Sequence, residues 1–152
     1  MRNPEHVLRT RTVLPRPVDE VFAFFSDAGN LERITPPELG FRIMPPLPAE
    51  VRAGTLIDYR LSLFGLPFGW RTEITGWDPP FEFVDTQISG PYAQWIHRHS
   101  FKPSDDGTLM EDEVRYRLPV PVAGEIAFPL VRLQLGRIFR YRGRRIRELL
   151  GN

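Results

Sequence analysis

The chain has 152 residues, of which 41% are hydrophobic and 26% charged, and its formal net charge at pH 7 is +1. This length fits one domain that is large enough to bury a core, and the near-neutral charge gives no overall attraction to nucleic acid. The sequence contains no cysteine, which excludes disulfides, thiolate metal sites and a cysteine nucleophile. No apolar run approaches the roughly 18 residues that cross a bilayer, so we expect a cytoplasmic protein without integral membrane contact.

The first quarter of the chain predicts one strand followed by two short helices. Residues His6–Leu14 alternate roughly between apolar and polar side chains, as in a strand. A helix is expected from Pro17, because proline suits a first helical turn and two acidic residues follow it. A second, shorter helix is expected over about 28–33, and it must end before the proline pair that follows.

The middle of the chain predicts six strands separated by turn residues. Their alternating apolar and polar positions give the ranges 40–44, 55–63, 70–77, 81–88, 92–101 and 109–118. A turn is expected over 64–67, and the sequence SDDG predicts a hairpin between the last two strands. If Pro103 lies opposite Thr108, the hairpin also pairs three buried positions. These pairs are His99 with Asp112, His97 with Val114, and Trp95 with Tyr116.

The last element is a long amphipathic helix over 129–150. At about 100° per residue, its apolar residues fall on one stripe that must face the core. The stripe contains Leu135, Ile138, Phe139, Ile146, Leu149 and Leu150. Seven arginines lie between 132 and 147, and one of them, Arg142, falls near the centre of the stripe at about 20°.

One strand, two short helices, six antiparallel strands and a long C-terminal helix is the order of the helix-grip fold. The segment VLPRPVDEVFAFFSDAGNLERITPPELGF resembles the opening of START and Bet v 1-like (SRPBCC) proteins, a group that includes bacterial polyketide cyclase and dehydratase relatives. The segment PPFEFVDTQISGPYAQWIHRHSF and the helix with IFRYR are similar to one bacterial branch of that group. The resemblance implies an α+β protein with a seven-stranded antiparallel sheet wrapped around the C-terminal helix. It also implies an apolar cavity between them, in a single domain over residues 1–152, and it supplies no catalytic residue.

Two histidines on the expected strand 92–101 are the first candidates for chemistry. His97 and His99 share a face with Trp95 and Phe101, so both imidazoles are expected to point inward. Asp112 on the neighbouring strand could orient His99 as a general base or as a hydrogen-bond partner for a ligand. The alternatives are a pair of wall histidines that satisfy each other, Asp112 and water, or a zinc site of His97, His99 and Asp112. Our principal interpretation includes no metal site and no cofactor.

Arg142 is the second candidate, because an unpaired guanidinium under an apolar stripe would cost several kcal/mol. It must pair with Asp85, Glu73 or Asp112, reach solvent along its stem, or meet an anionic ligand. The expected ligand-contacting residues also include aromatic and polar side chains on the sheet and the helix. The full set is Tyr59, Trp70, Asp85, Gln87, Trp95, His97, Phe101, Tyr116, Phe139 and Arg142.

Three functions follow as hypotheses. The first is binding of a hydrophobic or amphipathic small molecule, such as a lipid, an isoprenoid or a polyketide, between the sheet and the last helix. The second is a cyclase or dehydratase reaction that uses His99 with Asp112. The third is an interaction protein whose basic helix face meets a membrane or RNA, although that face is more often simply solvated and no nucleic-acid partner is expected. The loop FGLPFG could close over the cavity or pair two subunits, which leaves a homodimer open.

Overall fold

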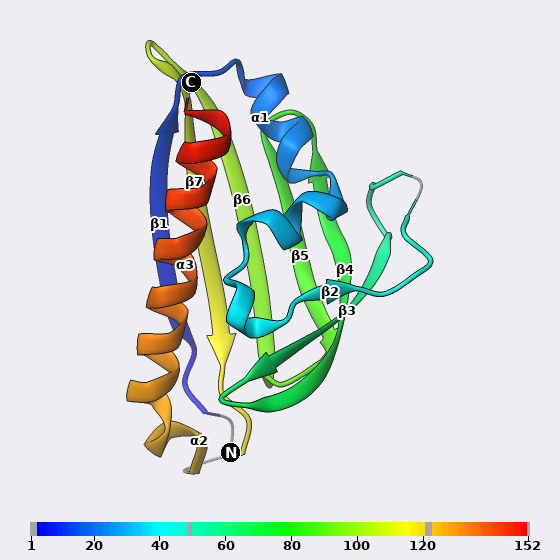
Figure 1. The fold of residues 1–152 in the computed structure, drawn as a ribbon, viewed down its shortest axis with the longest axis vertical. Helices are drawn as coiled ribbons and strands as arrows, with labels where there is room; N and C mark the ends of the chain where they lie inside the picture. The colour runs from blue at the N-terminus through cyan, green and yellow to red at the C-terminus, as the bar shows by residue number, and fades with distance from the viewer. Residues whose placement is uncertain (1–2, 49, 121–122, 152) are drawn as a thin grey trace.

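The computed structural model describes residues 3–48, 50–120 and 123–151 (Figure 1). Within these ranges the strands are β1 (His6–Leu14), β2 (Arg42–Ile43), β3 (Leu56–Leu63), β4 (Leu66–Asp78), β5 (Glu82–Ser89), β6 (Gln94–Ser104) and β7 (Gly107–Arg117). The helices are α1 (Val18–Phe25), the 3-10 helices η1 (Ala28–Ile34) and η2 (Pro37–Leu39), α2 (Ala123–Ile126) and α3 (Phe128–Leu150). None of the helices in the described ranges is long and apolar enough to cross a membrane.

The seven strands described form one antiparallel sheet in the order β1-β7-β6-β5-β4-β3-β2. Figure 1 shows α3 lying along one face of this sheet beside β1 and β7, with α1, η1 and η2 on the same face farther along. Contacts join α3 to β1 and η1, and α1 to β6 and β7. This arrangement is the helix-grip fold that the sequence predicts.

The hairpin of β6 and β7 has the predicted register. Trp95 pairs with Tyr116, His97 with Val114, and His99 with Asp112. Its two-residue turn ends at Gly107, whose φ of +130° lies in a region that side chains rarely adopt. The pairing of Pro103 with Thr108 that was assumed at the SDDG turn is also observed. Alternation then keeps the strand from slipping by one residue, because such a slip would expose the entire buried face.

The turn between β3 and β4 is tighter than the sequence predicts. Phe64 and Gly65 both have positive φ, 52° and 78°, so two residues complete the reversal. Leu66 and Pro67 then pair with β3, and β4 runs over Leu66–Asp78 instead of beginning at Trp70. A phenylalanine with positive φ is uncommon, and no residue pattern in this segment predicts one.

The buried stripe of α3 consists of Leu135, Phe139, Arg142 and Ile146. Consecutive members are four, three and four residues apart, which is about one helical turn. They therefore lie on one side of the helix, and this side faces the sheet. Arg142 is therefore buried among apolar residues, as the helical pattern predicted, and only 7% of it is exposed.

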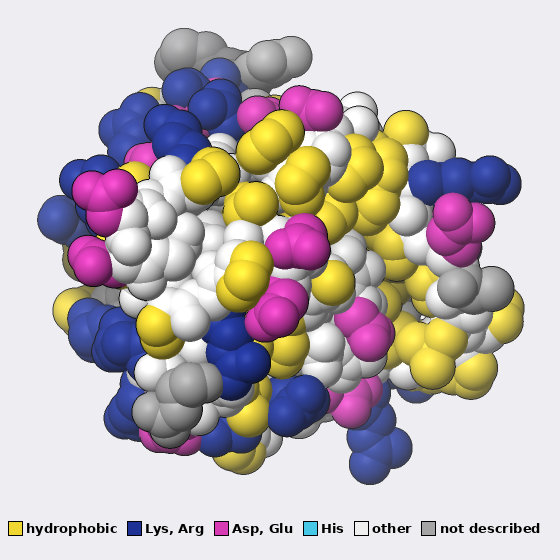
Figure 2. Space-filling model, turned by 90° about the horizontal axis from the view of Figure 1, so that it is seen from above, with side chains coloured by type: hydrophobic (Ala, Val, Ile, Leu, Met, Phe, Trp, Pro, Cys, Tyr) yellow, Lys and Arg dark blue, Asp and Glu magenta, His cyan; other side chains and the backbone are white. Residues whose placement is uncertain are grey.

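Most of the other arginines of α3 lie on its outer side. Arg137 forms an ion pair with Glu38, while Arg144 and Arg145 approach Glu148. Figure 2 views the end of the molecule at which α3 terminates, and it shows acidic side chains among the basic ones. Part of the basic face is therefore neutralised by acids of the chain itself.

The core consists of two apolar clusters. The first apolar cluster lies against α1 and contains Leu14, Val21, Phe22, Phe25, Ile34, Ile74, Phe83, Phe101, Met110 and Ile146. The second apolar cluster lies against the N-terminal half of α3 and contains Trp70, Tyr92, Trp95, Val114, Tyr116, Leu118, Leu135 and Phe139. Between them on β6 lie His97 and His99, since Trp95 belongs to the second cluster and Phe101 to the first.

Candidate functional site

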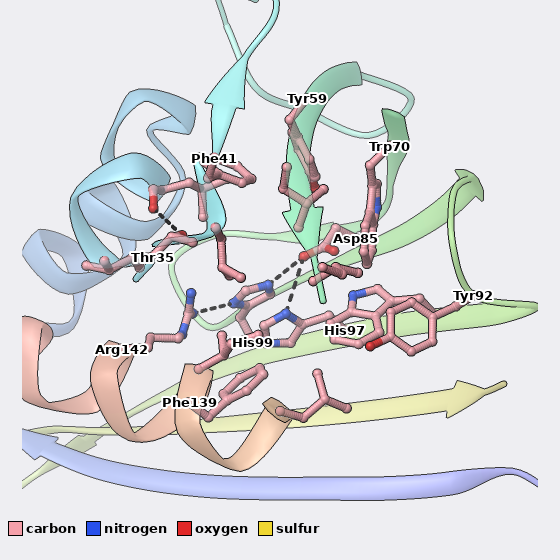
Figure 3. Close-up of a pocket in the computed structure, with 18 residues that line it drawn as sticks. Thr35, Phe41, Tyr59, Trp70, Asp85, Tyr92, His97, His99, Phe139 and Arg142 are labelled. Carbon is pink, nitrogen blue, oxygen red and sulfur yellow. Dashed lines mark hydrogen bonds and ion pairs between the residues drawn. The ribbon is translucent and has the colours of Figure 1, made fainter. Parts of the chain in front are cut away.

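Each buried imidazole is held by a carboxylate from a different neighbouring strand. Nε2 of His97 lies 2.7 Å from Oδ1 of Asp112 on β7, and Nε2 of His99 lies 2.7 Å from Oδ2 of Asp85 on β5. The two rings stack with their centroids 3.7 Å apart (Figure 3). Together with Arg142, these four residues form what we call the polar band of the core.

The pairing of His99 with Asp112 in the sequence hypothesis therefore needs correction. The two residues are opposite each other on β6 and β7, but their closest charged atoms are 3.4 Å apart, and Asp112 forms its short hydrogen bond with His97. In the same way Asp85 is opposite His97 on β5, yet its short bond goes to His99. Both carboxylates reach diagonally along the sheet, which register alone does not reveal.

Arg142 enters the polar band from α3. Its Nη2 donates to Oδ1 of Asp112 at 3.3 Å and to Nδ1 of His99 at 3.4 Å. The guanidinium carbon also lies 5.3 Å from the ring centre of Phe25 and 5.8 Å from that of Phe139. Of the partners that the sequence offered for Arg142, the structure places Asp112 in contact with it, which offsets the cost of burying the charge.

The charges in the polar band follow from burial and mutual contacts. Burial raises the pKa of Asp85, but the hydrogen bond from His99 and the charges of His97, His99 and Arg142 outweigh burial and leave that pKa below its ordinary value. Burial likewise raises the pKa of Asp112, and Arg142 with the two histidines drives it far below the ordinary value. Burial and the charge of His97 lower the pKa of His99 to about 4.

At neutral pH these shifts define the proton positions around His99. Because an ionised carboxylate can only accept, Nε2 of His99 carries the proton that it donates to Asp85. The ring is neutral, so its Nδ1 has a lone pair that accepts from Arg142. His99 is thus held at both nitrogens, whereas Nδ1 of His97 forms no hydrogen bond with any residue that the structure describes and lies 3.8 Å from Asp85.

A cavity of about 140 Å³ lies beside the polar band, between the sheet and α3 (Figure 3). Its sheet wall contains Tyr59, Leu61, Leu63, Trp70, Asp85, Tyr92, Trp95, His97 and His99. Its other walls contain Leu31, Ile34, Thr35, Leu39 and Phe41, and Leu135, Ile138, Phe139 and Arg142 of α3. The polar band thus forms one side of a cavity whose remaining walls are mostly apolar.

Two buried N–H groups of the cavity wall have no partner within the described residues. They are Nε1 of Trp70 and Nε of Arg142. A buried donor without an acceptor costs about 1–3 kcal/mol. Trp70 and Arg142 both line the cavity, but these two N–H groups have almost no accessible surface, so a molecule in the cavity reaches them only after the side chains move.

Of the predicted contact residues, the structure brings Tyr59, Trp70, Asp85, Trp95, His97, Phe139 and Arg142 to the cavity wall. It places three others elsewhere. Phe101 lies inside the first apolar cluster, Tyr116 packs in the second beside His6, and Gln87 bonds to the backbone of Tyr92 through both ends of its amide. None of these three residues is part of the cavity wall.

Sequence reasoning missed the wall formed by η1, η2 and the segment before β2. Thr35, Leu39 and Phe41 line the cavity there, and nothing in their local pattern distinguishes them from ordinary core residues. Leu135 and Ile138 could have been found, since they share the stripe of α3 with Phe139. Tyr92 was a weaker candidate, because it is the first residue of the expected strand 92–101, two residues before β6 begins.

Asp85, His97 and His99 also offer metal-ligating atoms, all within 4.8 Å of one another. The zinc alternative considered from sequence used Asp112 in place of Asp85. In the structure Asp112 lies behind the imidazoles, bonded to Nε2 of His97.

Comparison with known proteins places this architecture among related chains. The family model described as polyketide cyclase / dehydrase and lipid transport matches residues 14–140. No curated protein matches the sequence.

Solved structures give the same fold at low sequence identity. A protein from Chromobacterium violaceum has a TM-score of 0.69 at 16% identity, covering 96% of this chain and 98% of that one. A START superfamily protein from Mycobacterium smegmatis has a TM-score of 0.67 at 16% identity, covering 95% and 99%. Ginseng major latex-like protein 151 from Panax ginseng has a TM-score of 0.64 at 13% identity, covering 96% and 97%.

Proposed function

Because this chain belongs to the polyketide cyclase / dehydrase and lipid transport family, we propose that it binds a hydrophobic or amphipathic small molecule of lipid, isoprenoid or polyketide type. The ligand occupies the cavity between the sheet and α3. Its apolar part packs against Trp70, Trp95 and Phe139, and its polar group meets His97 and Arg142. The observation that carries this proposal is the cavity itself, which has the polar band on one side and mostly apolar side chains on the others.

The size of the cavity limits how such a ligand binds. A volume of about 140 Å³ is below the roughly 300–1,000 Å³ of sites that enclose a drug-sized molecule, and is close to what a single aromatic ring fills. Leu31, Thr35, Phe41 and Ile138 line the cavity and are only partly buried, so this side reaches the surface. The ligand therefore places a ring-sized portion inside, while a longer chain leaves between η1 and α3.

The direct test is mass spectrometry of the intact protein under native conditions, followed by organic extraction and identification of any released molecule. A bound lipid, isoprenoid or polyketide supports the proposal. If the protein is empty, binding of 2-naphthoate and of 2-naphthol is measured by tryptophan fluorescence, since Trp70 and Trp95 line the cavity. Failure of the empty protein to bind either probe, or any other ring-sized amphiphile, counts against the cavity as a ligand site.

Arg142→Met tests the role of the guanidinium in recognising a polar group. The ratio of naphthoate to naphthol affinity should fall by about tenfold, the loss of one charge-assisted hydrogen bond. The ratio cancels any general weakening of the cavity that the substitution causes. An unchanged ratio would mean that Arg142 is present only to balance Asp112.

Acid–base catalysis is a second candidate, favoured by the two imidazole–carboxylate pairs at 2.7 Å. An imidazole oriented by a carboxylate can remove an α-proton from a ketone, the first step of an aldol cyclisation. The geometry favours His97 with Asp112 for this role over His99, because Nδ1 of His97 has no hydrogen bond with a described residue while both nitrogens of His99 are bonded. The test is deuterium exchange at the α-carbons of cyclohexanone in D2O, followed by NMR, with His97→Gln and His99→Gln compared. Equal exchange with wild type and His97→Gln would reject catalysis by this pair.

A further inference from the structure

Three side chains with metal-ligating atoms converge at the edge of the cavity. Oδ2 of Asp85 lies 2.7 Å from Nε2 of His99 and 3.8 Å from Nδ1 of His97. Figure 3 shows the Asp85 carboxylate facing both imidazoles. We propose that Asp85, His97 and His99 bind one divalent transition-metal ion of the zinc type, at a site that goes beyond the ligand binding described above and does not depend on it.

The spacing of the donor atoms is close to that of a metal site. Bonds of about 2.0–2.2 Å to a tetrahedral ion keep donor atoms about 3.3–3.6 Å apart. The two separations that involve Asp85, 2.7 and 3.8 Å, lie on either side of this value, and the donor atoms of all three residues lie within 4.8 Å of one another. To bind one ion, the two stacked rings, whose planes are 25° apart, must rotate so that both lone pairs point to it, and the hydrogen bond of Asp85 with His99 must open.

The donor set has the composition that such ions prefer. Two neutral imidazoles and one carboxylate suit zinc and other divalent ions of the first transition row. Three protein ligands leave a further position for water or for an oxygen atom of a cavity ligand. All three residues line the cavity, so this open position faces it.

Asp112 supplies the support that metal-bound histidines require. A ligating imidazole usually donates its other N–H to a carboxylate or carbonyl, which fixes the orientation of the ring. Asp112 gives this support to His97, whose Nε2 lies 2.7 Å from its Oδ1. When Nε2 of His99 binds the ion, the proton of that ring moves to Nδ1, which then faces Oδ1 of Asp112 at 3.4 Å and no longer accepts from Arg142. Arg142 keeps its contact with Asp112 at 3.3 Å.

The position of Nδ1 of His97 also favours an additional partner at this point. It makes no hydrogen bond with a described residue, and it lies 3.8 Å from Oδ2 of Asp85, the oxygen atom that approaches His99. An ion bound beside Asp85 would therefore have Nδ1 of His97 within reach.

The test uses untagged, chelator-treated protein titrated with Co2+, which absorbs visible light when bound to nitrogen and oxygen donors in a four- or five-coordinate site. We expect one ion per chain, and native mass spectrometry with Zn2+ should give the same stoichiometry. His97→Gln, His99→Gln and Asp85→Asn should each weaken binding by more than about 100-fold, and Asp112→Asn by about 10–100-fold.

His6→Gln is the matched control. His6 is the one other histidine of the chain and lies on β1, bonded to Glu125 at 2.9 Å. Its substitution should leave Co2+ binding unchanged. Lack of binding by the wild type, equal binding by the three ligand variants, or loss of binding in His6→Gln would each overturn the proposal.

If the ligand variants do not fold, NMR of the wild-type protein tests the metal site. Zinc binding should shift the 15N resonances of Nδ1 of His97 and Nε2 of His99 in the spectrum of the imidazole rings. Absence of these shifts, or a shift at Nε2 of His97, would overturn the assignment. Ligand binding is measured separately in the presence of chelator, so failure of the metal site leaves that result unaffected.

Discussion

Asp112 lies opposite His99 in the backbone register of β6 and β7, but its carboxylate makes its short hydrogen bond, 2.7 Å, with His97. The same carboxylate meets Arg142 at 3.3 Å. Asp112 therefore links His97 on the sheet to Arg142 on α3. It is the residue on which the polar band depends most.

Removal of either partner of the Asp112–Arg142 pair should be strongly destabilising. Asp112→Asn and Arg142→Met should each lower the free energy of unfolding by about 3–5 kcal/mol, because each leaves the other charge buried and uncompensated. The double variant should lose less than the sum of the two. Guanidinium chloride denaturation of the four proteins gives the coupling energy.

The exposed pair of Arg71 and Asp58, at 2.8 Å, is the control for that cycle. Its coupling energy should be about 0–1 kcal/mol, since solvent screens both charges. Strict additivity at Asp112 and Arg142 would show that the buried pair contributes no more than the exposed one.

The tautomer of His99 can be checked directly in the metal-free protein. At pH 7 the proton should reside on Nε2, because Asp85 accepts from that atom and Nδ1 accepts from Arg142. Long-range 15N–1H NMR distinguishes the two neutral tautomers and the charged ring. A protonated Nδ1 would contradict the arrangement of donors around His99.

Trp70 should contribute a hydrogen bond to ligands that carry an oxygen near its indole. Trp70→Phe should weaken 2-naphthol by about tenfold, corresponding to one hydrogen bond, and should affect naphthalene much less. Trp77→Phe is the control, because Trp77 packs against Phe22 and Phe83 and does not line the main cavity. Equal losses for both probes would mean that Nε1 of Trp70 has no role in recognition.

Substitutions at Phe101 and Phe139 should distinguish an effect on stability from an effect on ligand binding. Phe101→Leu should lower the free energy of unfolding by about 1–3 kcal/mol, since the ring is fully buried in the first apolar cluster. The folded variant should bind naphthol as the wild type does. Phe139→Leu enlarges the cavity wall itself, so it should change the affinity. Isothermal titration calorimetry and thermal unfolding on both variants test this division, which an altered affinity in Phe101→Leu would contradict.

Gly107 should be intolerant of any side chain. Its φ is +130°, and an added Cβ would lie 2.2 Å from the backbone oxygen of Leu14. Gly107→Ala should therefore destabilise the protein by more than about 1 kcal/mol through backbone strain and collision with β1. Gly65→Ala is the comparison, because Gly65 has a φ of +78° and open space around it. The fall in Tm should be larger for Gly107→Ala. Equal falls would mean that backbone strain, and not the collision with β1, accounts for the whole effect.

The fold could be predicted because the sequence patterns that indicate its strands and helices are local and repeated. Alternation along β6 and β7 indicated the inward face, the SDDG turn indicated the register, and the helical period placed Arg142 in the buried stripe. The turn at Phe64 was not predictable in the same way, since it depends on a conformation that phenylalanine rarely adopts.

The sequence predicted several residues that line the cavity, but it did not predict their contacts with one another. His97, His99, Asp112 and Arg142 were identified from their faces, while the diagonal reach of Asp85 and Asp112 depends on side-chain torsions. The volume of the cavity depends on how large aromatic rings pack across the sheet, and no pattern along the chain contains that information.

The two apolar clusters on either side of the polar band have different roles in the core. The first apolar cluster holds α1 and the end of α3 against the sheet, and the second supplies more of the cavity wall, including Trp70, Leu135 and Phe139. Substitutions in the second cluster can therefore reshape the cavity while the first continues to stabilise the fold. Divergence in ligand preference among related chains is thus expected to concentrate in one half of the core, and conservation of packing in the other.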